Sequence, residues 1–337
     1  MRRMSKMMSA LGLMAAGTLA LTACSGSGGG AGTTPGASAG GSGETYQIGI
    51  SQLVQHPALD ATAEGFQRAF TEAGINAEFD LQNANGEQST ATTIAQGFST
   101  DGKDLVLAIA TPAAQAAAQS ITNVPVLFTA VTDPVAAELV ETAEAPGGNV
   151  TGTSDMNPVE EQIALITEID PSVKSVGIIY SSGEVNSEVQ VEAAREAAKG
   201  LGIEIKEATV TSSGEVATAA ESLGAVDAIY IPTDNRVTEA FESVVQYAES
   251  KQIPLFGSET NQVDRGAIAT LGLDYEELGF QTGQMAIRIL TEGADPATMP
   301  VEELDEFLLT VNPKAAERMG LTIPEAVAGR ADTTVEK

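Results

Sequence analysis

The feature that most constrains the fold is a series of short, continuously apolar segments that alternate with longer amphipathic ones. Uninterrupted apolar runs are typical of parallel strands covered on both faces. The expected strands are residues 46–51, 77–81, 105–110, 124–128, 175–180, 203–206, 225–231, 253–256 and, late in the chain, 307–311. The expected helices include residues 59–73, 189–201, 237–251 and 275–290, where apolar residues recur every three or four positions. This alternation predicts parallel sheets assembled from strand–helix units.

The alternation occurs twice, which predicts an α/β fold with two doubly wound parallel-sheet lobes. A length of 337 residues suits two domains. A Pro-Gly-Gly-Asn break at 146–149 ends the first series of strands and helices. We expect lobe 1 to comprise residues 44–152 plus about 275–311, and lobe 2 to comprise about 153–274 plus 312–337.

The N-terminal region has the pattern of an export signal. Basic residues precede an apolar stretch at 10–21, which is too short to span a bilayer as a helix. The next residues, Leu-Thr-Ala-Cys, match the lipobox of bacterial lipoproteins and end at Cys24, the one cysteine of the chain. We expect a signal peptide at 1–23, then lipidation at Cys24 and a Gly/Ser tether over 24–43. The lipid would anchor the protein to the outer face of the cytoplasmic membrane, at the cell surface.

Composition excludes several classes of function. Lys and Arg total 17 against 46 Asp and Glu, so the formal net charge of −29 would repel nucleic acid. One His and one Cys cannot assemble an ordinary zinc or haem site, so we expect no metal and no cofactor. Either ligand binding or carboxylate chemistry remains.

The polar residues that follow the predicted strands are the candidates for a binding site. Ligands bind beyond the carboxyl ends of strands in such sheets, here in the cleft between two lobes. Hydroxyl and amide groups at helix N-termini suit an anion such as a carboxylate. Acidic side chains in the same loops suit an ammonium group; they are Asp133, Asp155, Glu184, Asp234 and Glu259. The combination favours a zwitterion such as an amino acid.

Catalysis finds little support in the sequence. His56 is the one imidazole, and no GxSxG motif supplies a nucleophile. Paired carboxylates for glycoside hydrolysis stay open, although the absence of Trp and an aromatic content of 4% disfavour a sugar site. We expect a binding protein and not an enzyme.

Several motifs together resemble one family. They are segments 48–60 (IGISQLVQHPALD), 110–116 (ATPAAQA), 126–135 (VLFTAVTDPV), 149–152 (NVTG), 180–187 (YSSGEVNS), 227–235 (DAIYIPTDN), 266–267 and 272–279 (GLDYEELG). In combination they are similar to the ABC-transporter substrate-binding lipoproteins of the tryptophan/tyrosine-binding (TrpX-like) group. The resemblance covers essentially the whole chain after the tether.

The resemblance implies a type I periplasmic-binding-protein fold with a ligand cleft and three hinge crossings. It further implies a monomeric receptor that closes over an aromatic or other apolar amino acid and delivers it to an ABC permease and ATPase complex. The ligand-binding residues that it implies are Ser51, Thr111, Thr132, Asp133, Tyr180, Glu184, Asn186, Ser187, Asp234 and Asn235. Hydroxyls would hold the carboxylate, Glu184 or Asp234 the ammonium, and Tyr180 the apolar side chain.

Two further function classes stay open at this point. A lipid-anchored sensor lobe that signals to a membrane partner would have the same fold, and neighbouring permease and ATPase genes would distinguish it from a transport receptor. A hydrolase on the same scaffold would reveal itself by turnover of an ester or glycoside.

Overall fold

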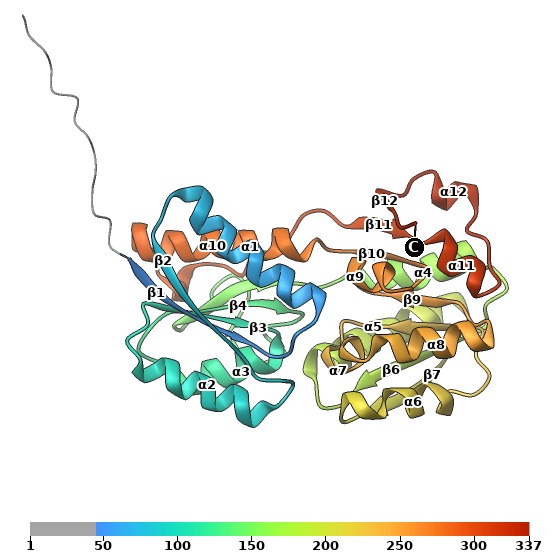
Figure 1. The fold of residues 1–337 in the computed structure, drawn as a ribbon, viewed down its shortest axis with the longest axis horizontal. Helices are drawn as coiled ribbons and strands as arrows, with labels where there is room; N and C mark the ends of the chain where they lie inside the picture. Colours follow the sequence, from blue (N-terminus) through green and yellow to red (C-terminus); the bar gives the residue numbers. More distant parts are fainter. Residues whose placement is uncertain (1–44, 337) are drawn as a thin grey trace, which may run out of the picture. The chain divides into compact units, whose positions relative to one another are not determined.

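The computed structural model describes residues 45–336. Lobe 1 is built on a five-stranded, all-parallel sheet with the order β2-β1-β3-β4-β5. Its strands are β1 (Tyr46–Gln52), β2 (Ala77–Asn83), β3 (Leu105–Ile109), β4 (Val126–Val131) and β5 (Val150–Ser154). Its helices are α1 (Pro57–Ala73), α2 (Gln88–Thr100), α3 (Thr111–Ser120) and α10 (Tyr275–Glu292). Helices α1 and α10 cover one face of the sheet, and α2 and α3 cover the other (Figure 1).

Lobe 2 contains a four-stranded parallel sheet and a small three-stranded sheet. The first has the order β7-β6-β8-β9, with β6 (Ser175–Ser181), β7 (Glu204–Val210), β8 (Ala228–Ile231) and β9 (Leu255–Gly257). The second consists of β10 (Ala269–Gly272), β11 (Leu308–Val311) and β12 (Thr333–Thr334). The helices are α4 (Val159–Ile169), α5 (Val185–Leu201), α6 (Val216–Ser222), α7 (Asn235–Glu239), α8 (Phe241–Lys251), α9 (Thr260–Asp264), α11 (Pro313–Arg318) and α12 (Glu325–Ala328).

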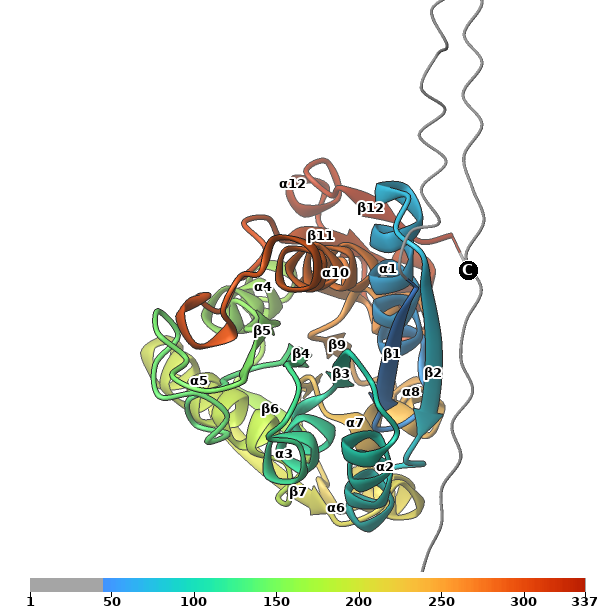
Figure 2. The same ribbon diagram turned by 90° about the vertical axis from the view of Figure 1, so that its left-hand side faces the viewer.

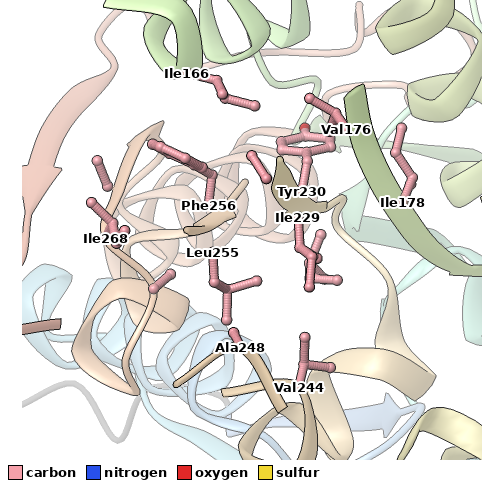
Figure 3. Packing of buried hydrophobic residues seen from close by; sticks show 14 of the residues in the cluster. Ile166, Val176, Ile178, Ile229, Tyr230, Val244, Ala248, Leu255, Phe256 and Ile268 are labelled. Carbon is pink, nitrogen blue, oxygen red and sulfur yellow. The ribbon is translucent and has the colours of Figure 1, made fainter. Parts of the chain in front are cut away.

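Alternation along the strands of lobe 2 fills two layers of its core. Tyr230 and Phe256 point to the side of the sheet that holds Ile166, and their neighbours Ile229 and Leu255 point to the opposite side (Figure 3). Residues on both faces are buried, as the continuous apolar runs in the sequence predict.

Helix α10 follows strand β10 of lobe 2 in the sequence, but it packs closely against α1 of lobe 1. Helices α1 and α10 lie side by side in both views (Figures 1 and 2). A Cβ at Gly65 would lie 1.9 Å from the Glu276 carbonyl oxygen, and one at Gly279 would lie 2.0 Å from that of Thr62. Only glycine permits this approach of the two backbones.

The chain crosses between the lobes three times within the described residues: from β5 to α4, from β10 to α10, and from α10 to β11. The first and third crossings are tied together by backbone hydrogen bonds. The amide of Ser154 donates to the Glu302 carbonyl at 2.8 Å, and that of Glu302 donates to the Gly152 carbonyl at 3.0 Å. These segments form the connection about which the lobes can move relative to each other.

The strands expected from the sequence are present, with ends that differ by up to four residues, and three strands were missed. These are β5, β10 and β12, which are short or rich in Thr and Gly. The helix expected over 237–251 is split at Ala240 into α7 and α8. The expected division placed residues up to 311 in lobe 1. Strand β11 instead pairs antiparallel with β10 and packs in the core of lobe 2.

Three expectations lie outside the described residues: the signal peptide at 1–23, lipidation at Cys24, and the tether over 24–43. Among residues 45–336, no helix has the length and apolar character needed to cross a membrane.

Candidate ligand-binding site

Two hydroxyl groups of lobe 1 are buried at the carboxyl ends of adjacent strands without a hydrogen-bond partner. Ser51 lies near the end of β1, and Thr111 begins α3, with Ala110 alone between it and the end of β3. Their side chains are 0% and 2% exposed, and neither Ser51 Oγ nor Thr111 Oγ1 has a partner. Buried hydroxyls are normally satisfied, so these two are available to a bound molecule.

Backbone strain accompanies these positions. Ala110, directly before Thr111, has a φ of 82°, and Ala130 near the end of β4 has a φ of 53°. A non-glycine residue with positive φ is costly, and such residues cluster at ligand sites. The strain therefore marks the same sheet edge as the unpartnered hydroxyls do.

Lobe 2 supplies an unpartnered acceptor at Asn186, in the first turn of α5. Its side-chain nitrogen donates to the Thr233 carbonyl at 2.8 Å and to Glu184 at 3.2 Å, which fixes the orientation of the amide. Its oxygen, Oδ1, is buried and has no partner. A ligand N–H donor would complete the hydrogen bonding of this group.

Glu184 lies directly before α5 and is held by neighbouring amides. Its Oε2 accepts hydrogen bonds from the Asn235 side chain at 2.6 Å, the Asn235 backbone at 3.3 Å and the Asn186 side chain. Burial, and secondarily the nearby charge of Asp234, raise the pKa of Glu184 to about 7.

Asp234 is occupied by the protein itself. Its carboxylate accepts from the Ser181 amide at 2.5 Å, the Ser187 hydroxyl at 2.6 Å and the Val237 amide at 2.8 Å. It thereby caps α7 and orders the loop after β6. This arrangement does not support the sequence-based hypothesis that Asp234 holds a ligand ammonium. Ser187 is likewise engaged by Asp234.

Thr132 belongs to a buried network that reaches both lobes. Its hydroxyl donates to Asp155 at 3.0 Å and accepts from the Gln190 side chain at 3.2 Å. Asp155 also accepts from the Tyr275 hydroxyl at 2.8 Å, and burial raises the pKa of this carboxyl. Thr132 is therefore at the interface of the lobes, with its hydroxyl already used.

The side chains of two further predicted residues, Tyr180 and Asp133, form hydrogen bonds within their own lobes. The Tyr180 side chain reaches across β6 to the edge strand β7, where its hydroxyl donates to Glu207 at 2.9 Å. This arrangement does not support the role of lining an apolar subsite that was expected from the sequence. Asp133 is partly exposed, and its carboxylate accepts from the amides of Val135 and Ala136 at 3.0 and 2.9 Å.

Glu259 is a functional candidate that the ten predicted residues omitted. It follows β9 and is 1% exposed, and its side chain does not cap α9 although it occupies the N-cap position. Oε2 has no hydrogen-bond partner. Burial raises the pKa of this carboxyl to about 8, with the charges of Asp155 and Asp234 adding to the effect. Its place after a strand was the available sequence signal.

Direct contacts connect the two lobes around these groups. His56 Nε2 lies 3.5 Å from Asn235 Oδ1, and the Arg236 guanidinium donates to the Gly86 carbonyl at 3.0 Å. Burial lowers the pKa of His56 to about 4, so the imidazole is neutral at physiological pH. A pocket of about 320 Å³ beside them is lined from both lobes, by residues that include Leu53, Pro112, Gln115, Ser182, Glu184 and Arg236.

The donor set suits a small organic zwitterion better than a metal ion. The unpartnered hydroxyls come from lobe 1, whereas the unpartnered oxygens of an amide (Asn186) and a carboxylate (Glu259) come from lobe 2. Within the described part of the chain, no group of three or more His, Cys, Asp or Glu side chains is placed to hold a metal ion.

Comparison with known proteins identifies the class to which this fold and site belong. The model of the family described as ABC transporter substrate binding protein matches residues 47–335, and the chain belongs to this family. This confirms the predicted family and the prediction of a binding protein instead of an enzyme.

Individual relatives are similar over most of the chain. A tyrosine-binding protein from Clostridioides difficile (strain R20291) is 42% identical over 270 residues, which are 79% of this chain and 78% of that protein. A structure from Streptococcus pneumonia in complex with L-Trp is 38% identical, has a TM-score of 0.84, and is matched over 87% of this chain and 100% of that one. A ligand-free, open substrate-binding protein from Clostridium difficile is 41% identical, with a TM-score of 0.66 and coverage of 87% and 99%.

The difference between the two TM-scores indicates the conformation of this structure. Sequence identity to the two relatives is nearly equal, yet the L-Trp complex superposes better than the open protein does. Together with the hydrogen bonds between the lobes, this indicates a closed arrangement. A distant glucose-galactose binding protein from Geobacillus stearothermophilus, 14% identical with a TM-score of 0.55 over 77% of this chain and 96% of that one, shares the fold alone. The predicted type I periplasmic-binding-protein fold is thereby confirmed.

Proposed function

We propose that this protein is the receptor of an ABC importer and binds an aromatic amino acid between its lobes. The observation that carries the proposal is the set of buried, unpartnered polar atoms contributed by both lobes. Ser51 Oγ and Thr111 Oγ1 suit a carboxylate, and Asn186 Oδ1 suits an ammonium group. The relatives that are named for tyrosine or were solved with L-Trp support an aromatic side chain on the ligand.

Capture proceeds by closure of the lobes about the crossing segments. A ligand that contacts Ser51 and Thr111 in lobe 1 and Asn186 in lobe 2 makes its full set of hydrogen bonds only when the lobes are closed. Its differential affinity for that state shifts the equilibrium toward closure. No bond is made or broken, and the closed receptor is the form that the permease and ATPase complex recognises.

The proposed location is the outer face of the cytoplasmic membrane. Cys24 at the end of a lipobox would carry the lipid, and the Gly/Ser stretch after it would give the lobes reach toward the permease. Mass spectrometry of the protein extracted from native membranes tests this directly. A diacylglyceryl-modified Cys24 at the N-terminus is expected, and an unmodified thiol there would contradict it.

The ligand is tested by calorimetric titration and thermal shift with L-tryptophan, L-tyrosine and L-phenylalanine, using glucose and adenosine as controls. An aromatic amino acid should raise the melting temperature, because a ligand that binds only the folded state stabilises it. Ser51→Ala and Thr111→Val should each weaken binding by about tenfold or more, since each removes a donor to the carboxylate. Thr93→Ala on the exposed surface of α2 is the matched control and should bind as the wild type does. Failure of all three amino acids to bind would overturn the proposal.

A further inference from the structure

Glu259 differs from the other acidic side chains that follow the strands because one of its carboxylate oxygens, Oε2, is buried without a hydrogen-bond partner. Asp155 accepts from two hydroxyls, and Asp234 accepts from two amides and a hydroxyl. Glu184 accepts three N–H groups on one oxygen, and Asp133 caps a turn. Glu259 Oε2 is fully buried with no partner.

The charged and titratable groups that face Glu259 do not provide the missing partner. They are Asp155 after β5, Asp234 before α7, Tyr230 on β8, Tyr275 on α10 and Arg265 after α9. The Tyr230 hydroxyl donates to Gln162 at 2.6 Å, and that of Tyr275 donates to Asp155 at 2.8 Å. Neither phenol is therefore free to donate to Glu259.

Arg265 is the one cation in this set, and its guanidinium interacts with other residues. Its guanidinium pairs with Glu242 at 2.7 Å and donates to the Thr238 carbonyl at 2.7 Å. It also lies over the Phe241 ring, 5.3 Å from the centroid. Its attraction only partly offsets the burial of the Glu259 carboxyl.

An ionised carboxylate in this setting is unfavourable, because burial removes its hydration and no donor replaces it. The group must either carry a proton or meet a cation that enters with the ligand. The raised pKa of Glu259, about 8, agrees with a neutral carboxyl in the closed, ligand-free protein at neutral pH.

We propose that Glu259 is the anchor for the ammonium group of the bound amino acid, and that the ligand replaces a proton on this carboxyl. The inference rests on the proposed function. On binding, the O–H bond of the Glu259 carboxyl breaks and its proton passes to solvent. The ligand keeps the three N–H bonds of its ammonium and donates one of them to the carboxylate. Asn186 Oδ1, also unpartnered, accepts a second.

The exchange makes ligand affinity depend on pH. Below a pH of about 8 the carboxyl must first lose its proton, so affinity should rise with pH, approaching about tenfold for each unit below that value. At higher pH the dependence on this group ends. Glu184, with a pKa of about 7, contributes to the same trend, and a substitution at Glu259 separates the two groups.

Calorimetry of the wild type and Glu259→Gln with L-tryptophan and L-tyrosine tests the proposal. Titrations at pH 5.5, 6.5 and 7.5, each in two buffers of different ionisation enthalpy, give the affinity and the number of protons released. The wild type should release up to about one proton from Glu259, with affinity rising over this range. Glu259→Gln should bind about 30-fold or more weakly at pH 7.5, with fewer protons released. Glu160→Gln, on the exposed first turn of α4, is the matched control.

A ligand without the amine distinguishes contact with the ammonium from a structural role. Indole-3-propionic acid keeps the ring and the carboxylate of tryptophan. Relative to L-tryptophan, it should bind poorly to the wild type and lose little further affinity in Glu259→Gln. A merely structural role would weaken both ligands equally and would overturn the inference. Circular dichroism and melting of the variant establish that it is folded, and Glu259→Asp, which keeps the charge, should recover part of the affinity for L-tryptophan if the variant retains its fold.

The two proposals fail in different ways. If the aromatic amino acids fail to bind the wild type at every pH, the proposed function is wrong, and the assignment of Glu259 as the ammonium anchor is wrong as well. If L-tryptophan or L-tyrosine binds, but Glu259→Gln keeps wild-type affinity and proton release, the assignment of Glu259 alone is wrong.

Discussion

The Tyr275 hydroxyl donates a hydrogen bond to the Asp155 carboxylate at 2.8 Å, and this contact joins two of the segments that cross between the lobes. Asp155 follows β5 at the first crossing, and Tyr275 begins α10 after the second. Both residues are buried, and Asp155 also accepts from Thr132 of lobe 1. The buried pair therefore links the crossing segments to Thr132 at the interface of the lobes.

Removal of this hydroxyl should weaken both the fold and ligand capture. Tyr275→Phe leaves Asp155 Oδ2 buried without its donor, which costs about 1–3 kcal/mol of unfolding free energy. Urea unfolding and titration with L-tryptophan measure the two effects. Tyr46→Phe, which removes a partly buried hydroxyl that donates to the Leu290 carbonyl at 3.2 Å, is the matched control. Equal losses in the two variants would contradict a special role for the hinge contact.

The glycines between α1 and α10 predict a strong effect of a single methyl group. Gly65→Ala would place Cβ 1.9 Å from a backbone carbonyl oxygen, and the helices would have to separate. We expect destabilisation of about 1–3 kcal/mol or more, seen as a lower melting temperature. Gly97→Ala in α2, where nothing lies within 4 Å of the added Cβ, should be stabilising by up to about 1 kcal/mol. An unchanged melting temperature of Gly65→Ala would be incompatible with the observed packing.

Stability without ligand should fall as the pH rises. The pKa values of Glu184 and Glu259 are raised in the folded protein to about 7 and about 8. The stability that these two carboxyls contribute is therefore fully present below about pH 4.5 and is lost as the pH rises from there through the two raised values. The loss should amount to a few kcal/mol by pH 8.5. Denaturant unfolding between pH 5 and 8.5 measures it. The double variant Glu184→Gln, Glu259→Gln should show a flatter profile, and a profile identical to that of the wild type would disprove the assignment.

The contact between Arg236 and the Gly86 carbonyl should favour the closed state. Arg236→Ala removes a hydrogen bond of 3.0 Å between the lobes, and a net loss of about 0.5–1.5 kcal/mol from closure is expected. Ligand affinity should fall a few-fold, while the melting temperature without ligand changes little. Arg330→Ala, which removes an ion pair with Glu168 within lobe 2, should leave affinity unaltered. A larger loss of affinity in the control would contradict this role for Arg236.

The sequence predicts most strands of the two parallel sheets, because most of them contain continuous apolar runs. Strand β5 was not predicted, because Val150 is the one large apolar residue in its sequence Val-Thr-Gly-Thr-Ser, although the structure buries all five residues. The threonines pair with one another and with the backbone, as in the 3.0 Å contact between Thr153 and Thr129. The lobe of β11 was misassigned because its antiparallel partner β10 lies far away in sequence, and no local pattern encodes that pairing.

The location of the site follows from the sequence, but the use of each side chain does not. Ser51, Thr111 and Asn186 lie after the expected elements and hold free polar atoms. Asp234 has the same sequence context, yet three donors of its own lobe occupy it. Tyr180 points away because the pleat directs it toward Glu207 on β7. Such differences depend on three-dimensional neighbours, which a pattern of residue types does not specify.

A crystal structure of the chain with bound L-tryptophan or L-tyrosine tests the central claim most directly. The account predicts a closed pair of lobes, with the ligand carboxylate at Ser51 and Thr111 and its ammonium at Glu259 and Asn186. A ligand bound elsewhere, or one whose ammonium contacts neither Glu259 nor Asn186, would contradict it.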